Sequence, residues 1–185
     1  NDARCVMIAP ARLTRWKGQI ILIEAAKLLT ARRPGAVKII FAGDAQGRDS
    51  YVAEMKALIA ENQLQESVAI VGHLAHMPTA FAASDIAVFP VIEPEAFGRG
   101  AVEAQAMGVP VIASSLGGYT ETIIDNETGF LTPPGSPSAL AVALERMIDV
   151  GADMRRAMGA RGRERVRALY TKSALQSATL EIYQR

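Results

Sequence analysis

The chain has 185 residues, of which 50% are hydrophobic and 21% charged, and a domain of this size buries about 70% of its unfolded surface without needing a metal or a disulfide. Because Cys5 is the only cysteine, no internal disulfide is possible, and a reducing compartment fits. Twenty basic and 19 acidic side chains give a formal net charge of +1, which argues against an electrostatic nucleic-acid binder.

Short apolar runs alternate along the chain with longer segments whose apolar residues recur at helical spacing. The runs expected to form strands cover residues 5–9, 37–42, 68–71, 86–89, 109–113 and 129–131. The segments expected to form helices cover residues 17–30, 51–60, 77–83 and 98–107, and helical spacing continues from residue 136 to the end. Runs that are apolar on both faces suit a parallel sheet covered by helices on each side. We therefore expect an α/β fold with a doubly wound, mostly parallel, six-stranded Rossmann-like sheet.

A proline-rich stretch, residues 132–137, separates the last expected strand from the helices that follow. Its prolines should end the strand, while Ser136 should cap the next helix with Pro137 in the first position. We expect residues 1–185 to form one domain, with residues 151–185 as a C-terminal helical extension. That extension holds eight basic and three acidic side chains. Its positive face would point to another domain, to an anionic membrane surface or simply to solvent.

The segments that directly follow the expected strands are the first place to look for chemistry, because open parallel sheets bind ligands beyond the carboxyl ends of their strands. Arg12 and Lys17 lie on one such loop, and Lys17-Gly18 opens a helix. Two cations that can converge, together with free backbone N–H groups at a helix start, suit a diphosphate. The alternative is that both are solvated loop charges.

The stretch from Glu95 to Glu103 contains two carboxylates eight positions apart, with glycines between them. Gly98 and Gly100 would let backbone amides approach a ligand closely at the start of a helix. Carboxylates accept hydrogen bonds from vicinal hydroxyls such as those of a sugar or a ribose. The alternatives are a first-turn acid favoured by the helix dipole for Glu95, and an ordinary exposed helix residue for Glu103.

At these residues the sequence resembles the C-terminal, donor-binding domain of GT-B fold glycosyltransferases, and most closely the retaining glycosyltransferase family 4 (glycosyl transferases group 1). The resemblance runs in order through most of the chain. Its pieces are Arg12-Leu13-Thr14-Arg15-Trp16-Lys17-Gly18, Phe41-Ala42-Gly43-Asp44, Val71-Gly72, the Glu95 to Glu103 element, Gly108-Val109-Pro110-Val111-Ile112-Ala113-Ser114, Gly117-Gly118-Tyr119-Thr120-Glu121 and Asn126-Glu127-Thr128-Gly129-Phe130-Leu131.

The resemblance implies a role for each position that matches. Arg12 and Lys17 would bind the donor diphosphate and stabilise it as the leaving group, and these two residues with Glu95 would form the catalytic set. Glu103 would bind the ribose hydroxyls. The remaining positions that would line the donor site are Gly43 after the second strand and His73-Leu74 beside the base.

The donor sugar would be held by Glu95 and by the backbone of Phe97, Gly98 and Arg99. The chain departs from the usual family pattern at Ala11 and Ala45, where glycine is frequent, and at Arg99, where a smaller residue is frequent. None of these departures removes a charged contact, but Arg99 would alter sugar selectivity.

The implied reaction moves a sugar, as a hexosyltransferase would, from a nucleoside diphosphate to an acceptor hydroxyl with retention, in cell-envelope glycan or glycolipid synthesis. Its transition state would be oxocarbenium-like, with charge growing on the departing diphosphate. The nucleotide-sugar donor is the only cofactor expected. No metal is expected, because the chain shows no ligand cluster and its only histidines, His73 and His76, are three apart on a turn.

The expected partners are a sugar or lipid-linked acceptor and the N-terminal acceptor domain of the same full-length chain, and no nucleic acid. Since the sequence starts at Asn1 without Met, we interpret it as an excised domain, inactive alone. No apolar run approaches the roughly 20 residues of a membrane span, so the expected location is the cytoplasm, with peripheral contact at the inner membrane surface. The sequence does not distinguish UDP, GDP and ADP as the nucleotide of the donor.

Three other functions are compatible with an α/β fold of this size. A dinucleotide-dependent oxidoreductase would carry G-x-G-x-x-G after the first strand, where this chain has Ala9-Pro10-Ala11-Arg12. A nucleotide-sugar epimerase can share the fold, but the Glu95 to Glu103 element argues against it. A non-catalytic nucleotide-binding α/β module remains as the third alternative.

Overall fold

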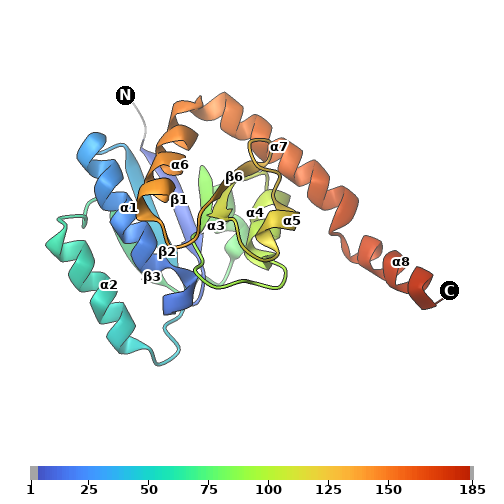
Figure 1. Cartoon of the computed structure of the whole chain (residues 1–185), viewed down its shortest axis with the longest axis horizontal. Coiled ribbons are helices and arrows are strands. Elements are labelled where there is room, and N and C mark those ends of the chain that lie inside the picture. The colour runs from blue at the N-terminus through green and yellow to red at the C-terminus, as the bar shows by residue number, and fades with distance from the viewer. Residues whose placement is uncertain (1–3, 184–185) are drawn as a thin grey trace.

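The six expected strands form one parallel sheet in the computed structural model, which describes residues 4–183 (Figure 1). They are β1 (Cys5–Pro10), β2 (Val37–Ala42), β3 (Val68–Gly72), β4 (Ile86–Phe89), β5 (Val111–Ser114) and β6 (Gly129–Thr132). The sheet order is β3-β2-β1-β4-β5-β6. Because β1 pairs in parallel with both β2 and β4, the winding direction reverses beside β1, and ligands bind at such a switch point. The expected doubly wound α/β fold is confirmed.

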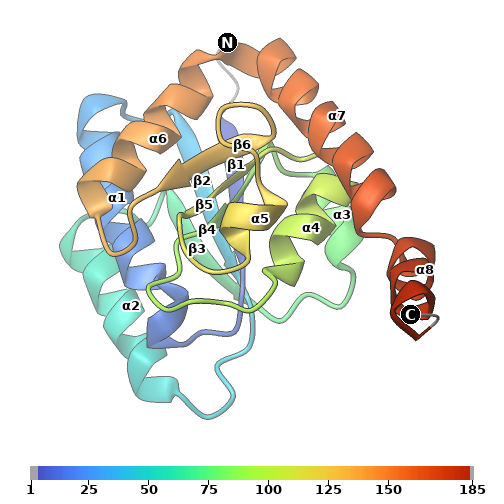
Figure 2. The same cartoon turned by 45° about the vertical axis from the view of Figure 1, so that its right-hand side comes forward.

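Helices cover both faces of this sheet (Figure 2). The helices are α1 (Gln19–Arg32), α2 (Asp49–Glu61), α3 (Met77–Ala82), α4 (Arg99–Ala106), α5 (Tyr119–Thr122), α6 (Pro137–Asp149), α7 (Gly151–Leu169) and α8 (Lys172–Tyr183). Helices α1, α2 and α6 pack on one face and α3, α4 and α5 on the other. Helix α5, only four residues long, was not expected from the sequence.

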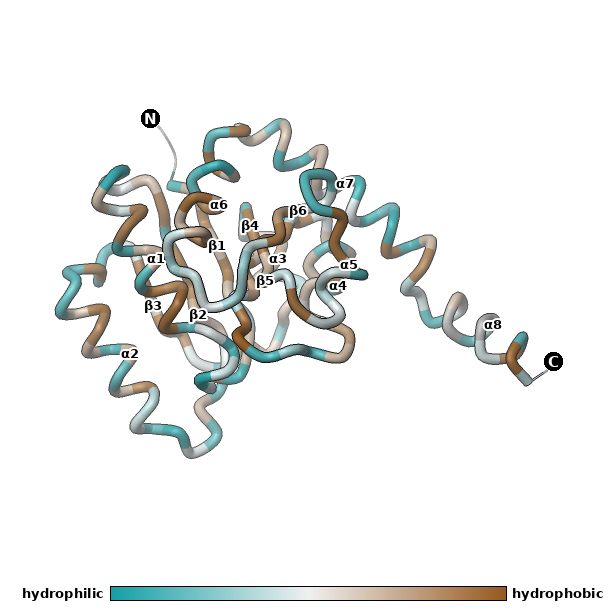
Figure 3. Tube along the Cα trace, viewed as in Figure 1, coloured by the Kyte–Doolittle hydropathy of each residue, from teal (hydrophilic) through white to brown (hydrophobic). Residues whose placement is uncertain are grey.

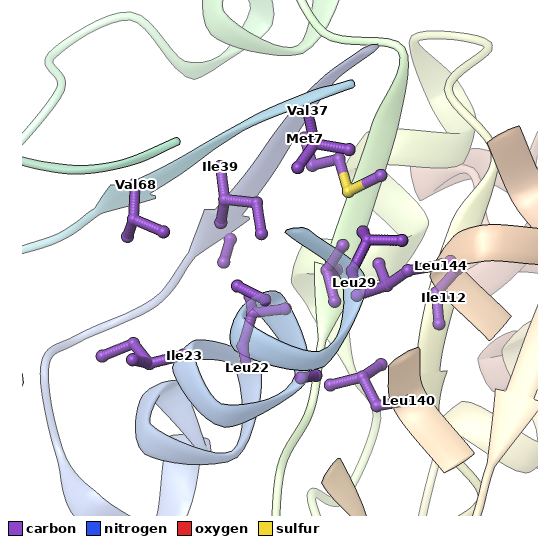
Figure 4. Close-up of a cluster of buried hydrophobic side chains, with 14 of the residues drawn as sticks. Met7, Leu22, Ile23, Leu29, Val37, Ile39, Val68, Ile112, Leu140 and Leu144 are labelled. Atoms are coloured by element: carbon purple, nitrogen blue, oxygen red, sulfur yellow. The ribbon is translucent and has the colours of Figure 1, made fainter. Parts of the chain in front are cut away.

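Alternation along each strand builds a separate core on each face, since successive strand side chains point to opposite sides. On one face Met7 and Ile39 meet Leu22 and Leu29 of α1 and Leu144 of α6 (Figure 4). The second core forms on the other face from the intervening strand positions and from α3, α4 and α5. Hydrophobic colour accordingly gathers along the central strands and alternates with polar colour along the outer helices (Figure 3). Burial of Cys5 in the first core raises the pKa of its thiol to about 11.

The observed elements begin and end within two residues of the expected bounds, and the later start of α1 has a local reason. The helix expected from Lys17 begins at Gln19, because Arg15–Lys17 forms a separate 3₁₀ turn that ends at Gly18 with a left-handed φ of 73°. The strand expected from residue 109 begins at Val111. The predicted cap is confirmed: the backbone N–H of Ala139 donates to Ser136 Oγ at 3.3 Å, and Pro137 opens α6.

Helix α7 is part of the domain, whereas α8 extends away from it (Figures 1 and 2). Four arginines of α7 donate to backbone carbonyls elsewhere in the domain, which adds cations at the carbonyl ends of α4 and α6. The bonds are Arg155 to Met147 and Ile148, Arg161 to Glu127, Arg163 to Ala106, and Arg165 to Glu121. These four side chains therefore also bind backbone of the domain itself, a role that the sequence did not indicate.

Within residues 4–183, no helix combines the length and the apolar character that crossing a membrane would require.

Two glycines of α7 give a matched test of its packing. A Cβ on Gly159 would lie 1.8 Å from the carbonyl oxygen of Gly108, whereas one on Gly162 would meet the Gln105 side chain at 3.1 Å. We expect Gly159→Ala to lower the free energy of unfolding by about 1–3 kcal/mol, since backbone cannot yield as a side chain can. Urea denaturation should show a much smaller loss for Gly162→Ala, partly offset by the helix propensity of alanine. Equal losses in the two variants would contradict the tight α7 contact.

Candidate functional site

A cleft of about 840 Å³ opens at the carboxyl ends of the central strands. Its walls come from the loops after β1, β2, β3 and β4 and from the start of α4. All ten residues that the sequence singled out line this one cleft: Arg12, Lys17, Gly43, His73, Leu74, Glu95, Phe97, Gly98, Arg99 and Glu103. The structure thus brings them together, as the topology of an open parallel sheet requires. Gln46 and, on α3, Met77 and Phe81 also line the cleft, and no sequence pattern pointed to these three residues.

The ion pair between Lys17 and Glu95 joins two loops that are 78 residues apart in the sequence. Lys17 Nζ donates to Glu95 Oε1, and only 14% and 18% of the two side chains are exposed. The backbone of the two loops is also bonded, because the N–H of Ile92 donates to the carbonyl of Trp16 at 2.9 Å. Gly18 is required here, since a Cβ would lie 1.8 Å from the carbonyl oxygen of Pro90.

Tyr119 gives Glu95 a second partner from below the cleft. Its hydroxyl donates to the same Oε1 at 2.9 Å, and its side chain is almost fully buried. Burial, followed by the charge of Glu95 and this hydrogen bond, raises the pKa of Tyr119 well above its ordinary value, so the hydroxyl remains a donor at neutral pH. Both recorded hydrogen bonds of the carboxylate fall on Oε1, and Oε2 accepts none from residues 4–183.

The start of α4 rests on two aromatic rings, Phe89 and Tyr119, which stack with centroids 5.8 Å apart. A Cβ on Gly98, whose φ is +74°, would lie 2.8 Å from the Tyr119 ring, and one on Gly100 would lie 2.7 Å from the Phe89 ring. The first N–H groups of a helix have no acceptor within it. In the described part of the chain, the amides of Arg99 and Gly100 have no recorded acceptor elsewhere, so they remain available to an anion.

The backbone of Arg12 is held by buried groups of α1 and α2. Gln19 Nε2 donates to the carbonyl of Arg12 at 2.9 Å, and the Tyr51 hydroxyl donates to Gln19 Oε1 at 3.0 Å. Gly43 packs against the same loop, where a Cβ would lie 1.8 Å from the carbonyl oxygen of Ala11. The Arg12 guanidinium is exposed and has no recorded ion-pair partner among residues 4–183. A positioned and uncompensated cation therefore faces the cleft.

Arg99 and Glu103 form an i, i+4 ion pair of 3.3 Å on α4, with 86% and 50% of their side chains exposed. Solvent screening makes such a pair weak, so either group can exchange its partner for a ligand. The cleft continues past them into a cavity of about 550 Å³ beside α3, whose walls include Leu74, Met77 and Pro78. This end of the site is therefore largely apolar, with one carboxylate at its edge.

Phe97 is supported from the far end of the chain. Its ring meets Tyr170, which follows α7, edge to face with centroids 5.6 Å apart. The Tyr170 hydroxyl in turn donates to the carbonyl of Glu121 at 3.1 Å. Sequence spacing gave no sign of this contact, because 73 positions separate the two rings.

Metal ligation has no support in residues 4–183, where no group of three or more His, Cys, Asp or Glu side chains could hold an ion. His73 lines the cleft, whereas His76 Nδ1 is hydrogen-bonded to Thr79 Oγ1 at 2.8 Å. Another cavity of about 430 Å³ lies between β6 and α6, with Phe130 and Arg146 in its wall, and none of the ten candidate site residues lines it.

Comparison with known proteins gives consistent results. The family model described as glycosyl transferases group 1 matches residues 1–165. The chain is 31% identical over 146 residues to a D-inositol 3-phosphate glycosyltransferase of Pseudarthrobacter chlorophenolicus, covering 77% of this chain and 34% of that protein. It is 26% identical over 172 residues to the capsular polysaccharide biosynthesis glycosyltransferase CapM of Staphylococcus aureus, covering 93% and 44%. The chain thus spans less than half the length of these two relatives.

Among solved structures, Anabaena Alr3699/HepE in complex with UDP and glucose superposes with a TM-score of 0.88 and 29% identity. The match covers 98% of this chain and 49% of that one.

A double-mutant cycle on Lys17→Met and Glu95→Gln tests the link between the two loops. Because the pair is mostly buried, we expect a coupling of about 1–3 kcal/mol in the free energy of unfolding. The matched control is the exposed pair, Arg99→Met with Glu103→Gln, for which screening should leave about 0.5 kcal/mol or less. Denaturant unfolding of the wild type and the six variants gives both values. Equal couplings in the two cycles would show that the Lys17–Glu95 pair does not join the loops.

Proposed function

The chain belongs to the glycosyl transferases group 1 family, and we propose that it forms the donor-binding half of a retaining glycosyltransferase. Its role is to bind a nucleoside-diphosphate sugar while the sugar is moved to an acceptor hydroxyl. The observation that carries the proposal is the pairing, in one cleft, of the uncompensated Arg12 guanidinium with the free amides at the start of α4. A planar cation opposite a helix N-terminus suits a diphosphate.

Different groups around this anion site would contact different parts of the nucleotide sugar. Glu95 and the backbone at Phe97 and Gly98 lie at the sugar end, where they can accept from and donate to hydroxyls. Glu103 lies at the opposite end, where ribose hydroxyls can donate hydrogen bonds to its carboxylate in place of the ion pair with Arg99. The apolar cavity beside α3 has room for the base. The Anabaena structure holds UDP and glucose, which supports a nucleotide-sugar donor.

The proposed transfer step depends on stabilising the negative charge that develops on the departing diphosphate. As the bond from the anomeric carbon to the diphosphate breaks, negative charge grows on the leaving group. Arg12, Lys17 and the α4 amides stabilise that charge more in the transition state than in the ground state. The sugar becomes oxocarbenium-like. Oε1 of Glu95 is already bonded to Lys17 and Tyr119, and we assign the carboxylate, through its other oxygen, Oε2, to binding a hydroxyl of the donor sugar.

The rest of the proposal concerns the full-length protein. An N-terminal acceptor domain would complete the active site, so the chain alone would bind donor without transferring sugar. The name of the Staphylococcus aureus relative supports a glycan of the cell envelope as product. We place the reaction in the cytoplasm or at the inner membrane surface, where α8 and the remaining basic side chains of residues 151–183 could face lipid.

Calorimetric titration of the folded chain with UDP, GDP and ADP tests the proposal, and we expect at least one of them to bind. Lys17→Ala and Glu103→Ala should each weaken that binding by about 1–3 kcal/mol, since each removes one partner of a charged hydrogen bond. Lys27→Ala and Glu24→Ala, which truncate exposed side chains of α1, are the matched controls and should leave the affinity unchanged.

Two results would count against the proposal. The first is that none of the three nucleotides binds at millimolar concentration although circular dichroism shows a folded chain. The second is that a nucleotide binds with the same affinity to the wild-type chain and to both cleft variants.

A further inference from the structure

Tyr119 does more than fill the core beneath the cleft. We propose that it is a positioning residue, which holds the Glu95 carboxylate in the orientation that receives the donor sugar. The inference rests on the proposed function, because it assigns a determinant of sugar binding within the same site. Its basis is the hydrogen bond of 2.9 Å from the Tyr119 hydroxyl to Glu95 Oε1.

A glutamate carboxylate needs such a partner, because the torsion that turns its two oxygens is broad and has no sharp minimum. Lys17 also donates to Oε1, but an ammonium on a four-carbon stem is a mobile point charge that does not define a direction. Lys17 therefore supplies the charge at Oε1, and the Tyr119 hydroxyl supplies the direction of the hydrogen bond. They share Oε1 and leave Oε2 for a hydroxyl of the ligand.

Tyr119 can define that direction because its own ring is immobilised. The ring is stacked on Phe89, and its edge occupies the space where a Cβ of residue 98 would otherwise lie. Only 1% of the residue is exposed. A rigid buried donor keeps its hydrogen bond without losing side-chain entropy when ligand binds. Tyr119 therefore supports both ends of the turn from Glu95 to Gly98.

The main chain of Glu95 is held separately, by the two residues before Tyr119. The N–H of Gly118 donates to the Glu95 carbonyl at 2.8 Å, and a Cβ on Gly117 would lie 2.4 Å from that oxygen. These contacts persist when only the Tyr119 hydroxyl is removed. Tyr119→Phe thus keeps the ring, the turn and the α4 amides, and changes only the orientation of the carboxylate.

The test compares a nucleoside diphosphate with its sugar conjugate. Titrations use UDP with UDP-glucose, GDP with GDP-mannose and ADP with ADP-glucose, and the pair whose nucleotide binds the wild-type chain is carried forward. We expect Tyr119→Phe to keep the Kd of the nucleotide within about twofold and to raise the Kd of the nucleotide sugar about tenfold, the usual scale for a hydrogen bond to a charged group.

Thr122→Val is the matched control. Thr122 is also buried on α5, and its hydroxyl donates to the carbonyl of Gly118 at 2.9 Å, with no recorded contact to Glu95 within residues 4–183. Thr122→Val should lose about as much thermal stability as Tyr119→Phe, while its Kd values for the nucleotide and the nucleotide sugar stay within about twofold of wild type. A selective loss of sugar affinity in Tyr119→Phe would then not be a consequence of lower stability.

Three outcomes would overturn the inference. Tyr119→Phe could leave both affinities unchanged, or it could weaken the nucleotide and its sugar conjugate equally, which would make Tyr119 a purely structural residue. A wild-type chain that binds none of the nucleotides would refute the proposed function, and this inference would fall with it. The wild-type titration therefore separates the two failures.

Discussion

The cleft depends on how a mostly buried carboxylate, that of Glu95, is neutralised. A carboxylate removed from water must find a cation or several donors, and Glu95 finds Lys17 from the turn after β1 and Tyr119 from α5. Three segments that are distant in sequence thereby converge on a single carboxylate. The same contacts that satisfy the charge also shape the end of the cleft that we propose receives the sugar, so this proposal couples stability to binding.

Close packing beneath the cleft explains why glycines are needed at the start of α4. The stacked pair of Phe89 and Tyr119 fills the space that Cβ atoms at positions 98 and 100 would need. With small residues above rigid rings, the helix begins close to the sheet edge and its first amides stay open to the cleft. The anion site that we propose is thus built from backbone, and Arg12 adds a side-chain cation whose own backbone is held by Gln19.

Sequence patterns were sufficient for the sheet and for the ten candidate residues that line the cleft, because both follow from local regularities. Strand periodicity placed the carboxyl ends of β1 to β4 at one edge, and the residues after them, such as Arg12 and Glu95, had to meet there. The hydroxyl of Tyr119 could not be assigned to Glu95, because that contact spans 24 positions and depends on the depth at which the ring is buried. Likewise, composition revealed the positive charge of α7, but only the packed structure shows that Arg163 caps α4 and that Arg155 caps α6.

Amide shifts in ¹⁵N–¹H spectra of the labelled chain, recorded as the nucleoside diphosphate with the highest affinity is added, offer the most direct measurement. If Arg12 and the start of α4 form the diphosphate site, the amides of Gly18, Arg99 and Gly100 should shift most, with smaller changes at His73 and Leu74. The cavity between β6 and α6 is the rival location. Saturable shifts confined to Phe130, Leu131 and Arg146, with the α4 amides unchanged, would show that the nucleotide binds elsewhere.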